Sequence, residues 1–238
     1  MELTVPEAKI EAEALAYAKA HKKTIGKRLT DPAVYLPEEN PVSVFMAGSP
    51  GAGKTEASIE LLASLAGPPV LRIDPDELRT QFPDYRGANA YLFQKGVSVL
   101  VEKIQDLALD QWQSFLLDGT LSRYEKALDN IQRSLKKKRT VQILYVYQEP
   151  LQAWAFVQAR EAAEGRRIRP EDFVNQYFAA REVVNRLKRE LGKEISVDLL
   201  MKNNDNSSRF YRAGVEQIDS HIPELFTRSD IERYLGLA

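Results

Sequence analysis

Apolar residues in this chain fall into short continuous runs that are separated by longer segments with helical spacing. The runs cover residues 42–47, 70–74, 114–118, 140–148 and 194–202, and their length and apolar character predict buried strands. Between these runs, apolar residues recur every three or four positions, as in amphipathic helices. Strands that alternate with helices in this way predict an α/β fold, with a parallel sheet covered by helices on both faces.

Proline and glycine separate the predicted helices from their neighbours, for example at Gly67-Pro68-Pro69 and at Gly165. The predicted helices span 6–23, 54–66, 88–112, 123–138, 150–163 and 170–192. The chain has no repeat and no low-complexity linker, so we expect one domain over residues 32–238, preceded by an N-terminal helical extension over residues 1–31.

Composition narrows the classes of function. The 238 residues carry a net charge of −1, which makes nucleic acid an unlikely partner. The chain lacks cysteine, which excludes disulfides, thiolate zinc sites and cysteine nucleophiles and fits a cytoplasmic location. We expect no signal peptide in the charged N-terminal stretch and no membrane span, because no apolar run approaches about 18 residues.

The strongest local motif is GSPGAGKT, which follows the first predicted strand and opens a helix. It matches the phosphate-binding pattern G-x-x-x-x-G-K-[ST] at every fixed position, so we expect a P-loop that binds a nucleoside triphosphate with Mg²⁺. Backbone N–H groups would face the phosphates, Lys54 would reach the β- and γ-phosphates, and Thr55 would bind the metal. The predicted nucleotide-binding residues are Gly48, Ser49, Pro50, Gly51, Ala52, Gly53, Lys54 and Thr55.

Carboxylates follow the second and third predicted strands. Asp74 precedes Pro75, and a helix cap is its favoured interpretation. Asp76 either complements the helix dipole or orients an acceptor hydroxyl and takes its proton. Asp118 ends the third strand, in the position of an acid that supports Mg²⁺ through water, and Gly119 would let a ligand approach the backbone.

A basic loop follows the helix after the fourth strand, where P-loop kinases place a lid. It carries Arg160, Arg166, Arg167 and Arg169. Arginines brought over the γ-phosphate would stabilise the charge that is transferred. The alternative interpretation is a solvated basic helix end, which the residues alone leave open.

Four segments in this order resemble the zeta toxin family of toxin–antitoxin systems: GSPGAGKT, RIDPDELR, FLLDGT and VQAREAAEGRRIRPEDF. The resemblance spans about residues 40 to 190 and implies a P-loop kinase fold, with ATP and Mg²⁺ as cofactors. It also implies phosphorylation of the 3′-hydroxyl of UDP-N-acetylglucosamine, which inhibits growth, and an antitoxin partner that blocks the nucleotide site. The N-terminal extension would pack on the domain or contact that antitoxin.

The resemblance also implies roles for single residues. Lys54, Arg160 and Arg167 would hold the γ-phosphate, and Asp76 would be the catalytic base. Glu102 is assigned to the substrate by resemblance alone. Substrate-binding positions are implied at Glu102, Asp118, Gly119 and Thr120, and metal-binding positions at Thr55 and Asp118. Leu121-Ser122 departs from the family pattern, in which an arginine follows soon after the strand-end motif.

Two other functions remain open at this point. The chain could be a P-loop kinase of another acceptor, such as a nucleoside, an antibiotic or a nucleic-acid end. It could also be a binding protein that depends on a nucleotide and acts by complex formation.

Overall fold

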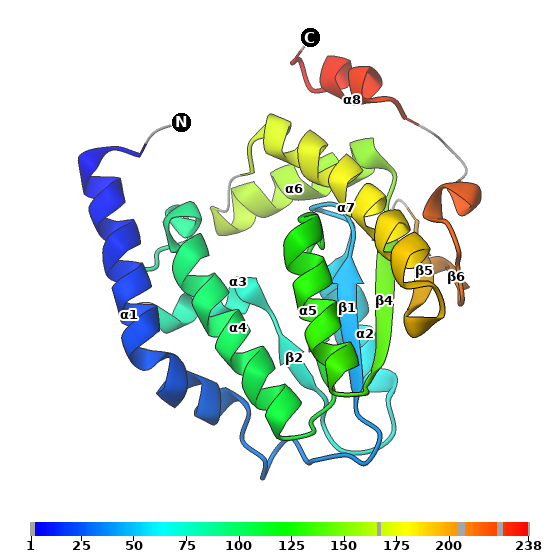
Figure 1. The fold of residues 1–238 in the computed structure, drawn as a ribbon. Coiled ribbons are helices and arrows are strands. Elements are labelled where there is room, and N and C mark those ends of the chain that lie inside the picture. The colour runs from blue at the N-terminus through cyan, green and yellow to red at the C-terminus, as the bar shows by residue number, and fades with distance from the viewer. Residues whose placement is uncertain (1–2, 166–167, 204–207, 223–225, 238) are drawn as a thin grey trace.

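The computed structural model describes residues 3–165, 168–203, 208–222 and 226–237 of the chain. Its strands form one sheet in the order β2-β3-β1-β4-β5-β6 (Figure 1). The first five strands are parallel, and β6 pairs antiparallel with β5. The strands are β1 (Val42–Ala47), β2 (Leu71–Ile73), β3 (Phe115–Leu117), β4 (Thr140–Tyr147), β5 (Ser196–Lys202) and β6 (Ser208–Arg212).

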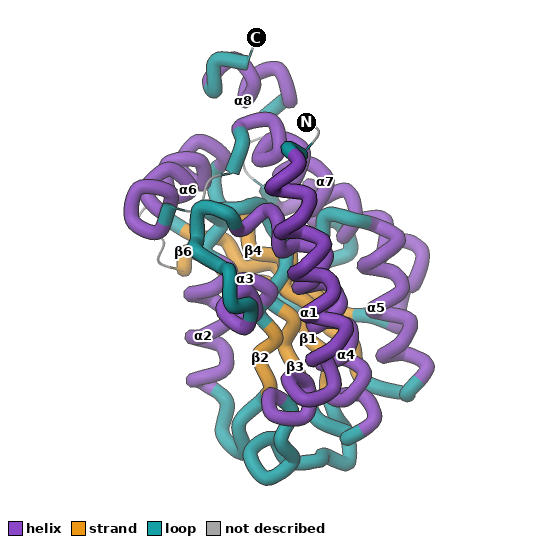
Figure 2. The backbone as a smooth tube through the Cα atoms, turned by 90° about the vertical axis from the view of Figure 1, so that its left-hand side faces the viewer, coloured by secondary structure: helices purple, strands orange, loops and turns teal. Residues whose placement is uncertain are grey.

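Helices cover both faces of the sheet, as the alternation in the sequence predicts. Helix α2 lies on one face, and α4, α5 and α7 lie on the other, with α1 outside α4 (Figures 1 and 2). The helices are α1 (Val5–Leu29), α2 (Lys54–Ser64), α3 (Pro75–Leu78), α4 (Gln94–Asp110), α5 (Tyr124–Lys136), α6 (Pro150–Glu164), α7 (Pro170–Leu191) and α8 (Arg228–Tyr234). No helix in the described ranges combines the length and the apolar character needed to cross a bilayer.

The core has two parts because successive side chains of a strand point to opposite faces. In β1, Phe45 joins the large core that α4, α5 and α7 cover. Its ring packs edge-on against the ring of Phe115, with the two ring centroids 5.9 Å apart. Met46 points the other way, into a smaller cluster with Ala57 of α2. The central strands are therefore apolar on both faces, which explains their continuous apolar runs.

Helix α1 packs along α4 through small residues. Ala14 and Ala18 are buried, and Glu11 pairs with Lys95 of α4 at 2.7 Å. The helix starts with a capping box at Thr4 and runs to Leu29, six residues beyond its predicted end. Helix α1 is thus packed against the rest of the described structure.

Further differences from the sequence-based expectation lie at α4 and β6. The helix predicted over 88–112 is a 3₁₀ turn at Ala90–Phe93 followed by α4. Strand β6 was not predicted, because its residues SRFYR lack an apolar run. It is an edge strand that is defined by pairing with β5, and edge strands often carry polar residues.

Candidate active site

The segment between β1 and α2 turns sharply around three glycines. Gly48, Gly51 and Gly53 have φ angles of 136°, 72° and 80°, which L side chains rarely adopt. A Cβ atom at Gly48 would lie 2.3 Å from the carbonyl oxygen of Val146. At Gly51 it would lie 2.1 Å from that of Ala153 in α6. The loop is therefore pressed against β4 and α6, in the strand–loop–helix setting that the phosphate-binding motif requires.

Lys54, the first residue of α2, folds back over this loop. Its Nζ donates hydrogen bonds to the carbonyl oxygens of Gly48 (3.1 Å) and Ser49 (2.6 Å). Removal from water lowers the pKa of Lys54 to about 8, and the nearby carboxylates of Asp118 and Asp76 partly oppose this change. Acids that follow β2 and β3 thus lie within electrostatic reach of the P-loop lysine.

Arg72 of β2 connects the buried acids at the ends of β2 and β3. Its Nη2 donates to Asp74 and to Asp118, each at 2.6 Å, and its Nε donates to Ser58 at 2.9 Å. The Ser58 hydroxyl has one proton, which it can donate to Asp118 at 3.0 Å or to the carbonyl oxygen of Thr55 at 2.8 Å. Because the carboxylates are only 6% and 4% exposed, they depend on this guanidinium for charge compensation. Burial raises the pKa of Asp74, as does the charge of Asp118, whereas Arg72 opposes the rise.

Sequence reasoning missed Arg72 and Ser58. A signal existed for Arg72, which stands between Leu71 and Ile73 in a buried strand where a charge needs a partner. The sequence did not indicate which residue pairs with Arg72. Asp118, predicted to support a metal ion through water, is held by these two side chains in the structure.

Asp74 and Asp76 have different environments although they are two residues apart. Asp74 Oδ1 accepts a hydrogen bond from the backbone N–H of Asp76 at 2.7 Å, which confirms its interpretation as the cap of α3. Asp76 is 36% exposed and pairs with Arg79, one turn further along. Of the three strand-end acids, Asp76 is therefore the most exposed.

The loop after β3 touches the P-loop. The backbone N–H of Gly48 donates to the carbonyl oxygen of Thr120 at 3.2 Å. The hydroxyl of Thr120 lies 3.0 Å from that of Ser122, and the space beside Gly119 is open. Leu121 has a φ of 53°, an unusual conformation for a residue with a side chain. The departure from the family pattern thus coincides with a tight turn beside the predicted site.

Glu102 lies on the exposed side of α4, where it pairs with Lys126 of α5. Its side chain is 48% exposed. Among the described contacts, none joins the Glu102 carboxylate to Arg72 or to Asp118. Its assignment to the substrate stays a prediction.

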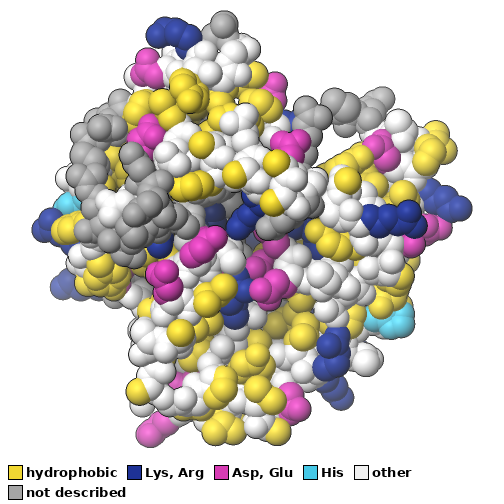
Figure 3. Space-filling view, turned by 180° about the vertical axis from the view of Figure 1, so that it is seen from behind, with side chains coloured by type: hydrophobic (Ala, Val, Ile, Leu, Met, Phe, Trp, Pro, Cys, Tyr) yellow, Lys and Arg dark blue, Asp and Glu magenta, His cyan; other side chains and the backbone are white. Residues whose placement is uncertain are grey.

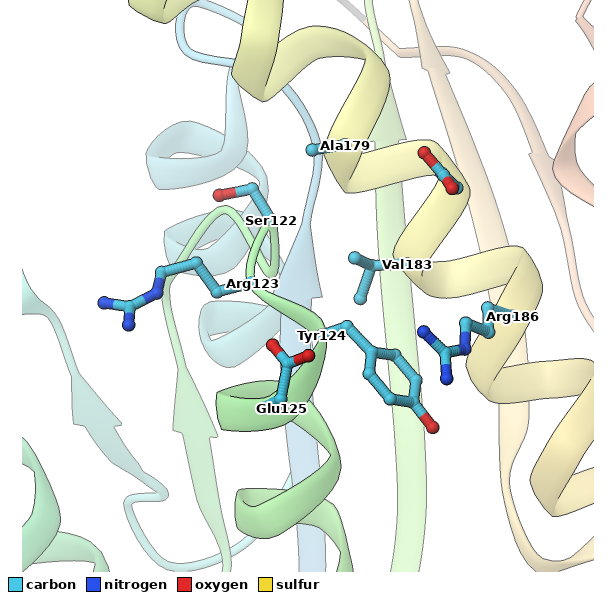
Figure 4. Close-up of a pocket in the computed structure, with 8 residues that line it drawn as sticks. Ser122, Arg123, Tyr124, Glu125, Ala179, Val183 and Arg186 are labelled. Carbon is cyan, nitrogen blue, oxygen red and sulfur yellow. The ribbon is translucent and has the colours of Figure 1, made fainter.

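A pocket of about 360 Å³ opens between the start of α5 and the middle of α7 (Figure 4). It begins at Ser122, directly after the loop of β3. The guanidinium of Arg186 lies over the ring of Tyr124, 3.4 Å from its centroid. Both side chains also bind Glu190, so the cation on this wall is already paired.

The basic segment between α6 and α7 is described only in part. Arg160 of α6 reaches α2, with its Nη2 3.9 Å from Glu56, and its charge adds to the lowering of the Lys54 pKa that burial causes. Arg167, the other predicted lid arginine, lies outside the described residues, as does Arg166. Arg169 pairs with Asp172 at 2.7 Å and so belongs to the start of α7.

These groups meet at the carboxyl ends of β1 to β4, where parallel sheets bind ligands. From the side that α2 covers, acidic and basic side chains gather around a hollow near the middle of the face (Figure 3). In the described part of the chain, no group of three or more acidic or histidine side chains is arranged to hold a metal ion alone.

Comparison with known proteins identifies the family. The zeta toxin family model matches residues 26–216. A chain of the PezAT chromosomal toxin–antitoxin system of Streptococcus pneumoniae has a TM-score of 0.60 at 18% identity, over 88% of this chain and 82% of that one. A chain in the crystal structure of AvrRxo1-ORF1:-ORF2 with ATP has a TM-score of 0.56 at 17% sequence identity, over 98% of this chain and 72% of that one.

A chain of the Pnkp1/Rnl/Hen1 RNA repair complex gives a TM-score of 0.53 at 14% identity, over 63% of this chain and 47% of that one. No sequence among the curated proteins matches. At such identities the structural likeness establishes the fold alone. The family model, however, covers most of the chain, and the chain therefore belongs to the zeta toxin family.

Proposed function

We propose that this chain is an ATP-dependent kinase that phosphorylates the 3′-hydroxyl of UDP-N-acetylglucosamine in the cytoplasm and so inhibits growth. The observation that carries the proposal is the position of Asp76. It is the accessible strand-end acid, and its charge acts on Lys54 of the P-loop. A hydroxyl placed between the two would face the γ-phosphate on one side and a proton acceptor on the other.

At the γ-phosphorus, one bond forms and one breaks, and a proton is transferred from the acceptor. The acceptor oxygen attacks the γ-phosphorus, the bond from that phosphorus to the bridging oxygen breaks, and its electron pair remains on ADP. The hydroxyl proton passes to the carboxylate of Asp76. Lys54 and the lid arginines, Arg160 and Arg167, would stabilise the charge on the transferring group.

The residues present fit Mg²⁺ in a supporting role. Thr55, the second residue of α2, offers a hydroxyl beside the phosphate loop, and its backbone carbonyl oxygen lies 2.8 Å from the hydroxyl of Ser58. Mg²⁺ commonly takes few protein ligands and completes its shell with phosphate oxygens and water. When bound, the ion would neutralise charge on the β- and γ-phosphates.

Family membership supports the choice of acceptor and of partner. The matched family is defined by zeta toxins, and the PezAT chain belongs to a toxin–antitoxin system. We infer that an antitoxin controls this chain by covering its nucleotide site. The AvrRxo1-ORF1:-ORF2 structure with ATP supports ATP as the phosphate donor.

The proposal is tested with labelled ATP and a panel of acceptors: UDP-N-acetylglucosamine, nucleosides, aminoglycosides and oligonucleotide ends. We expect label in the UDP-sugar. Asp76→Asn should abolish transfer while ATP binding persists, and Asp84→Asn, an exposed acid in the following loop, serves as the matched control.

If only another acceptor takes up label, that acceptor is the substrate and the assignment of UDP-N-acetylglucosamine is wrong. Absence of label from every acceptor, with growth inhibition retained by Asp76→Asn, would favour a nucleotide-dependent binding protein and contradict the kinase proposal.

A further inference from the structure

The side chain of Arg79 links the proposed catalytic acid to helix α4. Arg79 begins the 3₁₀ turn after α3, and it stands one helical turn beyond Asp76, so both side chains share one face. Its Nη1 donates to Asp76 Oδ1, and its Nη2 donates to Gln94 Oε1 at 3.1 Å. The guanidinium therefore bridges the acid and the first residue of α4.

The burial of Arg79 distinguishes it from a surface ion pair. The side chain is only 12% exposed, whereas its partner Asp76 is 36% exposed. Its Nε is buried without a hydrogen-bond partner. Leaving a buried donor unpaired costs stability, and such a group in a native structure calls for an explanation.

Helix α1 supports this segment from behind. The ring of Tyr17 lies 5.7 Å from that of Phe82, and Arg28 donates to Gln81. Phe82 in turn packs so closely on Gly96 of α4 that a Cβ there would lie 2.9 Å from the ring. Residues 79–82 are thus held between α1 and α4.

We propose that Arg79 is a positioning residue that fixes the orientation of the Asp76 carboxylate, and that α1 and α4 together keep Arg79 in place. The inference rests on the proposed function, because it assigns Asp76 the role of proton acceptor. A four-residue helix such as α3 cannot fix a side chain by itself, and an arginine held at two points can. The ion pair with Arg79 leaves Asp76 as a carboxylate that can orient the acceptor hydroxyl. A carboxylate in this role suits a loose transition state, in which proton transfer needs no strong base.

The test compares Arg79→Gln, Arg79→Lys and Arg86→Gln, the last being an exposed arginine in the following loop. Arg79→Gln should lower kcat by about tenfold to a hundredfold, while the Kd for ATP stays within about twofold. Arg79→Lys should recover part of kcat, because it keeps the charge without the double contact. Arg86→Gln should match the wild type.

A second perturbation covers the case in which Arg79→Gln is poorly folded. Tyr17→Ala loosens the support from α1 and leaves Arg79 intact, so kcat should fall with little change in the Kd for ATP. If Arg79→Gln and Tyr17→Ala both turn over like the wild type, or if they weaken ATP binding as much as they lower kcat, the positioning role is wrong. Failure of the proposed function is distinct, since the wild type would then phosphorylate none of the acceptors.

Discussion

The low pKa of Lys54 makes nucleotide binding depend on pH in a range where an ordinary lysine would not titrate. Burial lowers this pKa to about 8 in the free protein. A bound triphosphate favours the charged ammonium, so binding above pH 8 must take up a proton and becomes weaker. ATP itself contributes little, because its last phosphate proton leaves at about pH 6 to 7.

The size of the effect follows from the protonated fraction of Lys54. With a pKa of about 8, this fraction falls from about 0.76 at pH 7.5 to about 0.03 at pH 9.5. The Kd for ATP should therefore rise about 25-fold over two pH units, which is about 1.9 kcal/mol. A lysine with an ordinary pKa of about 10.4 would weaken binding by only about 1.1-fold.

Titration calorimetry measures this directly. At pH 8.5, binding in two buffers with different ionisation heats should reveal an uptake of about 0.8 proton per ATP. Lys54→Arg is the control, because its guanidinium stays protonated and its affinity should not change between pH 7.5 and 9.5. Proton uptake near zero in the wild type, or the same slope in Lys54→Arg, would refute the reasoning.

Three further predictions concern the fold around the site. Arg72→Met should lower the free energy of unfolding by about 3–5 kcal/mol in urea titrations, and by less at pH 5 than at pH 8, because the raised pKa of Asp74 lets protonation relieve its buried carboxylate once Arg72 is gone; equal losses at both pH values would contradict this. Gly51→Ala should weaken ATP binding at least about tenfold while circular dichroism stays native, since its Cβ would lie 2.1 Å from a carbonyl oxygen of α6; unchanged affinity would show that the loop tolerates the residue. Ala18→Asp, at a fully buried position of α1, should destabilise the chain by about 2 kcal/mol or more, whereas Ala20→Asp on the exposed side should change stability by under about 0.5 kcal/mol; equal midpoints would mean that α1 does not pack as described.

The features that the sequence predicted well are local. Residues 48–55 form a continuous motif, and their strand and helix neighbours are adjacent in sequence, so the P-loop could be recognised without knowing the fold. The cap at Asp74 is equally local, because its partner is the backbone N–H two residues away. The parallel sheet followed from the alternation of apolar runs and helices.

The features that were missed depend on contacts between distant segments. Arg72 meets Asp118 only because β2 and β3 are neighbours in the sheet, and Arg79 meets Gln94 only because α3 packs beside α4. The pair of Glu102 with Lys126 likewise joins two different helices, and the assignment of Glu102 to the substrate stays a prediction. Such pairings carry no signature in the spacing of a single sequence.

The central claim is that the γ-phosphate passes to a hydroxyl of a UDP-sugar with the help of Asp76. Mass spectrometry of small metabolites from cells that express the chain tests it most directly. The account predicts that a UDP-N-acetylhexosamine with one additional phosphate accumulates with the wild type and not with Asp76→Asn. Growth arrest without any phosphorylated UDP-sugar, or its accumulation at equal levels with Asp76→Asn, would contradict the account.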